Sequence, residues 1–152
     1  MSYLDVISLS EAKSYLRIDD TQNDTDAEIT LMIRSVLSYI EKATNHIMYD
    51  RDKTYNYSSG CVWVYDFPIN STVSTTHELE GKSGYSVYTD SSAKTIVLNV
   101  GYADPNDIPP ELLEYAFVML DYLYYGKDKD KSTGTYPQYI LDLLNQNRRF
   151  IV

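Results

Sequence analysis

The feature that most constrains the fold is a long, almost uninterrupted apolar segment from Ile108 to Gly126. Asp107 is placed to cap a helix here, the two prolines after Ile108 favour a first helical turn, and Gly126 is typical of a helix end. A helix that is apolar on nearly all sides must be buried on nearly all sides. The segment is short for a membrane span and carries three carboxylates. We therefore expect it to form, at about 109–125, the central helix of a small bundle.

The composition fits one domain with a hydrophobic core, because 43% of the 152 residues are hydrophobic. Lys and Arg number 13 against 22 Asp and Glu, and the net charge of −9 disfavours tight binding of nucleic acid, which needs a basic surface. The single cysteine, Cys61, excludes an internal disulfide and a thiolate zinc cage. We see no signal peptide and expect a reducing cytoplasm. The 16 tyrosines suit interfaces as well as cores.

Two short polar motifs near the start mark helix beginnings. Ser8 and Glu11 have the spacing of a capping box, which predicts a helix over about 9–16. The acidic run from Asp19 to Glu28 invites a calcium-binding interpretation, but Thr25 stands where an EF-hand loop requires glycine. We therefore expect a solvated loop that ends in a second capping box, from Thr25 to Glu28.

The segment from about Asp26 to Thr44 has the apolar spacing of an amphipathic helix. Its apolar stripe consists of Ile29, Met32, Ile33, Val36, Leu37 and Ile40. Asn45 is suited to the left-handed residue that follows a helix. We expect the stripe to pack against the helix at 109–125.

Short runs of β-branched and aromatic residues replace this pattern between about Tyr49 and Val100. The runs are Thr54–Tyr57, Cys61–Tyr65, Thr72–Thr76, Tyr85–Thr89 and Thr95–Leu98. Turn-forming residues at 58–60, 81–84 and 90–92 separate them, and Pro68 marks a strand end or edge. The sequence therefore predicts an antiparallel β element inserted between the two long helices.

The last segment combines an exposed loop, a short helix and a tail. Lysines at 127, 129 and 131 alternate with aspartates, and Pro137 then begins a helix from Gln138 to about Asn145. We see no internal repeat or linker. The sequence predicts one domain of class α+β, mainly α, with helical regions at 1–48 and 105–147, a β insertion at 49–104 and a tail at 148–152.

The residue types that carry common active-site chemistry form no recognisable site. His46 and His77 are the only histidines, and neither belongs to a metal-ligand cluster. No glycine-rich phosphate loop and no nucleophile elbow occur. Glu111 and Glu114 lie one turn apart and are interpreted as partners of the helix dipole, not as an acid/base pair. We therefore expect no catalytic residue, no cofactor, no metal and no enzymatic activity.

The order of several motifs gives a resemblance to a known family. The motifs are Leu9–Asp20, Asp26–Ile29, Tyr39–Asn45, Ile108–Leu112, Tyr122–Tyr125, Pro137, Leu143–Leu144 and Arg148–Arg149. In this order they resemble the phage head–tail connector family, also described as adaptor, head-completion or DNA-packaging proteins. Arg34 and Ser35 depart from the small pair that the family has in mid-helix, and Asn45 stands where glycine is common. The β insertion is longer than the family leads us to expect.

The resemblance implies a virion structural protein, built as a helical bundle with a β appendage. Such a protein is expected to form a dodecameric ring with copies of itself, below the portal protein and above a tail or stopper protein. DNA would pass through the ring without tight binding. The expected location is the neck of the virion, at the head–tail junction, after assembly in the host cytoplasm, with no membrane association.

Two other classes of function stay open. A small nucleic-acid-binding or packaging accessory module would need a basic stripe, which only the lysines at 127–131 and the arginines at 148–149 offer. An enzyme or enzyme subunit would need a deep polar pocket with converging carboxylates.

Acidic residues are the first candidates for a channel lining, because like charge keeps DNA mobile. The candidates are Asp19, Asp20, Asp24 and Asp26. The alternative is an outward, solvated loop with no such role.

The C-terminal residues are candidates for a subunit or portal interface. They are Arg148, Arg149, Phe150, Ile151 and Val152. Phe150 and Ile151 would serve as apolar anchors, and the two arginines would pair with carboxylates. The alternative is a tail that folds back on its own bundle.

Overall fold

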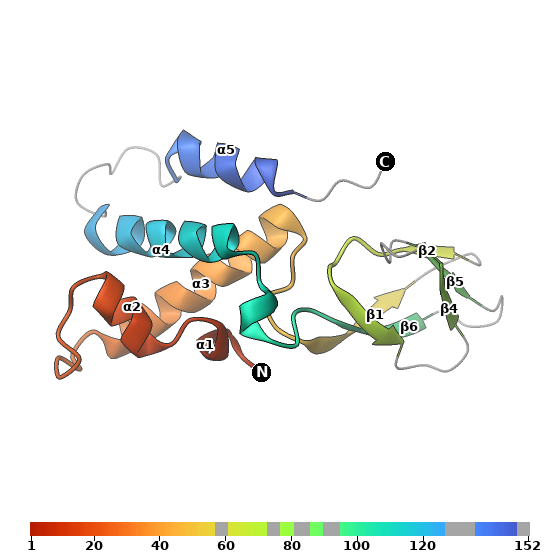
Figure 1. Ribbon diagram of the computed structural model, residues 1–152, viewed down its shortest axis with the longest axis horizontal. Helices are drawn as coiled ribbons and strands as arrows, with labels where there is room; N and C mark the ends of the chain where they lie inside the picture. Colours follow the sequence, from red (N-terminus) through yellow and green to blue (C-terminus); the bar gives the residue numbers. More distant parts are fainter. Residues whose placement is uncertain (57–60, 73–76, 81–85, 90–94, 127–135, 149–152) are drawn as a thin grey trace.

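The computed structural model has the helices at one end of the molecule and the strands at the other (Figure 1). It describes residues 1–56, 61–72, 77–80, 86–89, 95–126 and 136–148. The helices are α1 (Tyr3–Val6), α2 (Leu9–Tyr15), α3 (Asp26–Thr44), the 3-10 turn η1 (Pro105–Asp107), α4 (Pro110–Tyr125) and α5 (Gln138–Gln146). The strands are β1 (Arg51–Asn56), β2 (Cys61–Trp63), β3 (Ile69–Thr72), β4 (His77–Glu80), β5 (Ser86–Thr89) and β6 (Thr95–Val100). The predicted class, α+β and mainly α, is confirmed.

The long amphipathic helix α3 begins and ends where the sequence predicts. All six residues of its apolar stripe are buried. The helix contacts α1, α2, α4 and α5, so it runs through the middle of the bundle. Asn45 has a φ of 64° and donates its backbone N–H to the Glu41 carbonyl oxygen, which ends the helix as expected.

Helix α4 is fully or partly buried over most of its circumference, as expected, and only a strip of it is exposed. Its fully buried residues are Leu112, Ala116, Met119 and Leu120. Helices α2, α3 and α5 pack against α4, with α5 on the opposite side from α2 (Figure 1). The carboxylates of Glu111, Glu114 and Asp121 lie on the exposed strip. In the described part of the chain the bundle has no further layer over this strip.

The ends of α4 differ from the expectation. Asp107 does not cap it, because Asp107 belongs to η1, where the Asp104 carboxylate accepts from the Asn106 N–H at 2.9 Å. Pro109 stands at the cap position of α4 and has no side-chain oxygen to offer. Gly126 ends the helix in a right-handed conformation, with a φ of −84°. A Cβ at this position would lie 3.0 Å from the Tyr122 ring, so close contact with that ring, not a left-handed φ, favours glycine.

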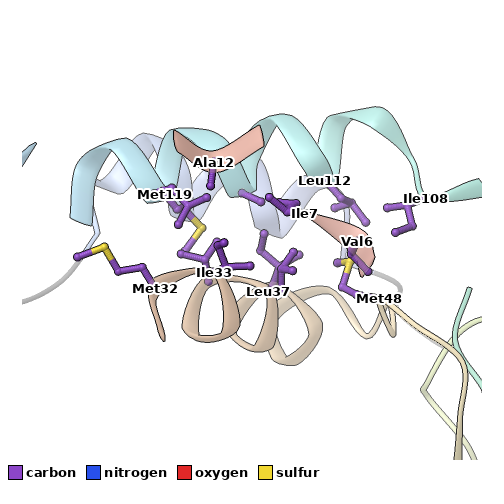
Figure 2. Close-up of a cluster of buried hydrophobic side chains, with 14 of the residues drawn as sticks. Val6, Ile7, Ala12, Met32, Ile33, Leu37, Met48, Ile108, Leu112 and Met119 are labelled. Carbon is purple, nitrogen blue, oxygen red and sulfur yellow. The ribbon is translucent and has the colours of Figure 1, made fainter. Parts of the chain in front are cut away.

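The main hydrophobic core lies between α3 and the other helices. Figure 2 shows Ile33 and Leu37 of α3 directed toward Ile7, Ala12 and Met119. Val6, Met48, Ile108 and Leu112 extend the same cluster toward the strands. Helix α5 adds Ile140 and Leu144, as its spacing predicts. No helix in the described residues is long and apolar enough to cross a membrane.

The strands form two small antiparallel sheets, with orders β1-β6-β3 and β2-β5-β4. The first sheet has its own cluster of buried residues, Ile47, Val64, Ile96, Leu98 and Val100. Strand β3 lies mostly before the predicted run at 72–76, of which only Thr72 is among the described residues, and β4 falls in a segment for which no strand was expected. The predicted turns at 58–60, 81–84 and 90–92, the loop at 127–131 and the tail residues 149–152 lie outside the described residues.

A short crossing joins the helical part to the first sheet. The Ile47 N–H donates to the Phe67 carbonyl oxygen at 2.8 Å, and the Phe67 N–H donates to the backbone carbonyl oxygen of Asn45 at 2.9 Å. Gly101 has a φ of +109°, and a Cβ there would lie 2.1 Å from the Tyr49 carbonyl oxygen. Only glycine fits at position 101, because the backbone there passes so close to the backbone of Tyr49.

Candidate functional site

The acidic loop between α2 and α3 is tied to the bundle by a buried lysine. Lys13 is 3% exposed, and its Nζ lies 2.5 Å from the Asp26 Oδ1. The same ammonium donates to the carbonyl oxygens of Gln22 at 2.8 Å and Asp20 at 3.3 Å. Because an ammonium ion in the interior must be paired, these three contacts fix the path of the loop.

The four candidate channel residues therefore have different surroundings. Asp26 forms an ion pair with Lys13 and is therefore not a free surface charge. Asp19 accepts from the Thr21 hydroxyl at 2.6 Å and from the Thr21 N–H at 2.8 Å, and these hydrogen bonds lower the pKa of its carboxyl group. Asp20 and Asp24 are exposed. The loop brings acidic side chains to the surface, and in the described residues no three His, Cys, Asp or Glu side chains are grouped so that they could hold a metal ion.

The second capping box expected at the start of α3 does not form. The Thr25 side chain makes no cap hydrogen bond, and its Oγ1 is buried with no partner in the described part of the chain. Thr25 adopts a right-handed conformation, with a φ of −104°, whereas a capping residue is usually extended. The Lys13–Asp26 ion pair holds this end of the helix instead. The first capping box, at Ser8 and Glu11, is confirmed.

A second buried charge, Glu41, joins the helices to the sheet. Its side chain is 6% exposed, and its carboxylate accepts from the Arg51 guanidinium at 3.0 and 2.8 Å. The Met48 N–H donates to it at 2.8 Å and the Tyr3 hydroxyl at 2.7 Å. Burial, together with this hydrogen bond to a carboxylate, raises the pKa of Tyr3 to about 12. One carboxylate thus connects α1, α3 and β1.

This junction was not identified from the sequence, although a signal was present. Glu41 stands four residues after Leu37, at a position that continues the apolar stripe of α3. A charged residue at such a position is buried and must have partners. The same reasoning applies to Lys13, which lies four residues after Leu9 and three before the buried Leu16.

Three surface hollows are lined by described residues. The first, about 450 Å³, is lined by Tyr15, Leu16, Arg17, Asp121 and Tyr125. The second, about 380 Å³, includes Glu41 and Arg51, which are bound to each other. The third, about 320 Å³, is formed by the acidic loop and includes Lys13 and Asp26. In the second hollow Glu41 pairs with Arg51 and Lys53 pairs with Asp66, and Lys42 also lines this hollow. In the third hollow Lys13 and Asp26 form the buried pair described above.

The remaining candidate residues lie apart from each other. His46 is buried, and its Nδ1 lies 2.7 Å from the Tyr102 hydroxyl, on the side of the molecule where the sheet begins. Glu111 and Glu114 are exposed on α4. Of the C-terminal candidates only Arg148 is described, and it is exposed; Arg149, Phe150, Ile151 and Val152 lie outside the described residues.

Comparison with solved structures finds this fold in gene transfer agent (GTA) particles. A chain of the neck of an empty GTA particle, computed with C6 symmetry, matches with a TM-score of 0.72 and 14% identity, over 100% of this chain and 94% of that chain. A chain of the neck of a native GTA particle, computed with C12 symmetry, matches with a TM-score of 0.68 and 13% identity, over 100% and 94%. A chain of the virion of a native GTA particle matches with a TM-score of 0.67 and 13% identity, over 97% and 91%.

No protein-family model and no curated protein matches the chain. At 13–14% identity the structural matches show a shared fold. This shared fold spans the whole chain, including the β insertion.

Proposed function

We propose that this chain is a structural protein of a virion neck, which forms an adaptor ring between the portal and the tail or stopper and extends the DNA channel. The observation that carries the proposal is the match, over 100% of this chain, to a chain from the neck of a GTA particle. The order of helical motifs along the sequence, which resembles phage head–tail connectors, supports the same function independently. A protein with this role needs no active site.

The ring is part of the proposal. The two neck structures were computed with C6 and C12 symmetry, which favours a closed ring of identical copies. We propose a dodecamer, with the portal protein on one side and a tail or stopper protein on the other. The helices and the β insertion would act as one connector domain, because Glu41 binds Arg51 and Met48 across the boundary between them.

The passage of DNA is expected to depend on weak contact. The exposed carboxylates of the acidic loop, at Asp19, Asp20 and Asp24, are our candidates for the channel wall. An acidic wall repels phosphates and releases no counterions, so it leaves DNA free to move. Asp26 is withdrawn from this set because it is paired with Lys13.

Electron microscopy of the purified chain, alone and mixed with the portal protein of the same particle, tests the proposal. We expect rings that sit coaxially on the portal and a channel that is continuous through both. A chain that stays monomeric in both samples contradicts the proposal. A salt-dependent gel shift with duplex DNA by such a monomer would favour the alternative, a nucleic-acid-binding or packaging accessory module.

A further inference from the structure

Two outer helix faces of the bundle carry opposite charge. The α3 face consists of Ala27, Leu31, Arg34, Ser35, Ser38 and Lys42, which share one side of the helix. The α4 face consists of Glu111, Glu114, Val118, Asp121 and Tyr125, which share one side of that helix. The first face presents two cations, with the exposed carboxylate of Glu28 at its edge, and the second presents three carboxylates.

Neither set of charges is used within the described part of the chain. Arg34 and Lys42 are exposed and make no ion pair or hydrogen bond there, in contrast to Lys13, Arg51 and Lys53. Glu114 and Asp121 are likewise exposed and unpaired among the described residues. A cationic face is unusual on a chain whose net charge is −9.

The two faces point away from each other. The buried stripe of α3 and the buried side of α4 pack together in one core. Each charged face lies opposite the buried side of its own helix. The α3 face and the α4 face are therefore on opposite outer surfaces of the bundle. Two different faces on opposite sides of one molecule are the arrangement that a head-to-tail ring requires.

The spacing of the charges along the two helices also agrees. Arg34 and Lys42 are eight residues apart, about 12 Å along a helix. Glu114 and Asp121 are seven residues apart, about 10 Å. Both cations of one copy can therefore face carboxylates of another copy at the same time.

An exposed apolar residue completes the α3 face. Leu31 is 65% exposed, the largest exposed fraction among the large hydrophobic residues described. On the α4 face, Tyr125 is 50% exposed and borders the hollow that Tyr15 and Asp121 also line. Exposed ion pairs contribute little affinity and mainly set orientation, so the apolar contacts are needed for stable association.

We propose that neighbouring copies of this chain join through these faces, with the α3 face of one copy on the α4 face of the next. The inference rests on the proposed ring and assigns the surfaces that build it. The occupant of each face is a second copy because the two faces are complementary in charge to each other, in sign and in spacing. Arg17, at the rim of the hollow, is the one described cation beside the α4 face.

Reversing the charges of one face at a time tests the assignment. One variant carries Arg34→Glu and Lys42→Glu, so both of its faces are acidic. The other carries Glu114→Lys and Asp121→Lys, so both of its faces are basic. Each variant alone should associate at least about 100-fold more weakly than the wild type, because like charges then meet at every contact. Sedimentation velocity measures the association, and thermal unfolding of the monomer shows that each variant is folded.

Mixing the two variants gives the decisive result. In an equimolar mixture each contact can join an acidic face to a basic face, so rings with alternating copies should form near the wild-type concentration. A control with Asp52→Lys and Asp142→Lys, at two exposed sites outside both faces, has the same charge change as the basic variant and should assemble as the wild type does. Assembly of either variant alone at the wild-type concentration overturns the assignment, as does a mixture of folded variants that stays monomeric. If the wild type forms no ring, the proposed function is overturned as well. If the wild type forms rings and each variant alone assembles equally well, only the assignment of these two faces is overturned.

Discussion

Glu41 and Arg51 form a two-point ion pair, with Nη1 of Arg51 3.0 Å from Oε1 of Glu41 and Nη2 2.8 Å from Oε2. Glu41 lies in the last turns of α3, and Arg51 is the first residue of β1, so the pair crosses from the bundle to the sheet. Because the Glu41 side chain is only 6% exposed, its charge depends on this partner. In the ring that we propose, this contact would hold the β insertion in a fixed orientation to the helices.

Replacing Glu41 should destabilise the whole molecule. In Glu41→Gln the Arg51 guanidinium loses its counter-charge and Tyr3 its charged acceptor, and we expect a loss of roughly 3 kcal/mol in the free energy of unfolding. Urea unfolding followed by circular dichroism measures it. Glu114→Gln makes the same chemical change at an exposed site and should alter the free energy by less than about 0.5 kcal/mol. Equal free energies of unfolding for Glu41→Gln and Glu114→Gln would show that the contacts of Glu41 do not stabilise the fold.

The buried side of α4 should not tolerate a charge. Leu120 is 0% exposed within the main core, and Leu120→Asp should unfold the chain, because an unpaired buried carboxylate costs more than about 4 kcal/mol. Leu31→Asp places the same residue at a site that is 65% exposed and should leave the melting temperature of the monomer almost unchanged. Cooperative thermal unfolding of Leu120→Asp near the wild-type temperature would contradict the packing of α4.

The capping box of α2 should give a stability contribution that depends on pH. Hydrogen bonds from the Ser8 hydroxyl at 2.6 Å and the Ser8 N–H at 2.8 Å lower the pKa of Glu11. A lowered pKa in the folded state stabilises the fold above the ordinary pKa of glutamate, and this contribution is lost as pH falls through the folded value. Ser8→Ala should cost about 1 kcal/mol at neutral pH.

Carbon-detected NMR of the Glu11 carboxyl group measures this effect at the residue itself. Its pKa should move upward toward the ordinary value in Ser8→Ala. The difference in the free energy of unfolding between the wild type and Ser8→Ala should become smaller in acid. It should not vanish, because Ser8→Ala also removes the hydrogen bond from the Glu11 N–H to the Ser8 hydroxyl at 3.2 Å, and this loss does not depend on pH. An unchanged Glu11 titration in Ser8→Ala would mean that the capping box does not bind the carboxylate in solution.

Removing residues 148–152 should separate assembly from folding. The deletion begins after Asn147, whose side chain donates to the Tyr115 hydroxyl at 3.3 Å and to the Leu143 carbonyl oxygen at 3.2 Å, so these two contacts of α5 remain. The hydrogen bond from the Arg148 N–H to the Asn145 carbonyl oxygen is lost. If Phe150 and Ile151 dock on a neighbouring subunit or the portal, burial of the two contributes on the order of 3–5 kcal/mol, or a few hundred- to a few thousand-fold in affinity.

The shortened chain should then keep its melting temperature as a monomer and fail to assemble on the portal at the wild-type concentration. Differential scanning calorimetry and a portal-binding assay measure the two properties. A lower melting temperature in the shortened monomer would instead show that the tail folds back on its own bundle.

The helical part of the fold was largely predictable from the sequence because its signals are local. The apolar stripe of α3 and Asn45 gave the bounds of that helix, and Ser8 with Glu11 gave the start of α2. The cap at Thr25 failed because a tertiary contact, the Lys13–Asp26 pair, holds that helix end. Such a contact joins distant positions, and no local pattern specifies it.

The strands and the junction were harder to predict. Strand β4 reads His77-Glu78-Leu79-Glu80, which contains no β-branched or aromatic residue, so pairing with β5 and not propensity makes it a strand. Glu41 and Arg51 are ten residues apart on different elements, and their pairing depends on where the chain leaves α3. The α3 and α4 faces could be recognised only after both helices were placed against the same core.

The most direct test of the proposed neck function is an asymmetric reconstruction of the head–tail junction of the particle that carries this chain. The account predicts a closed ring of copies of this fold between the portal and the tail or stopper, with α3 of each copy against α4 of the next and acidic loops toward the DNA. Absence of the chain from purified particles, or a junction whose density has no place for this fold, would contradict it.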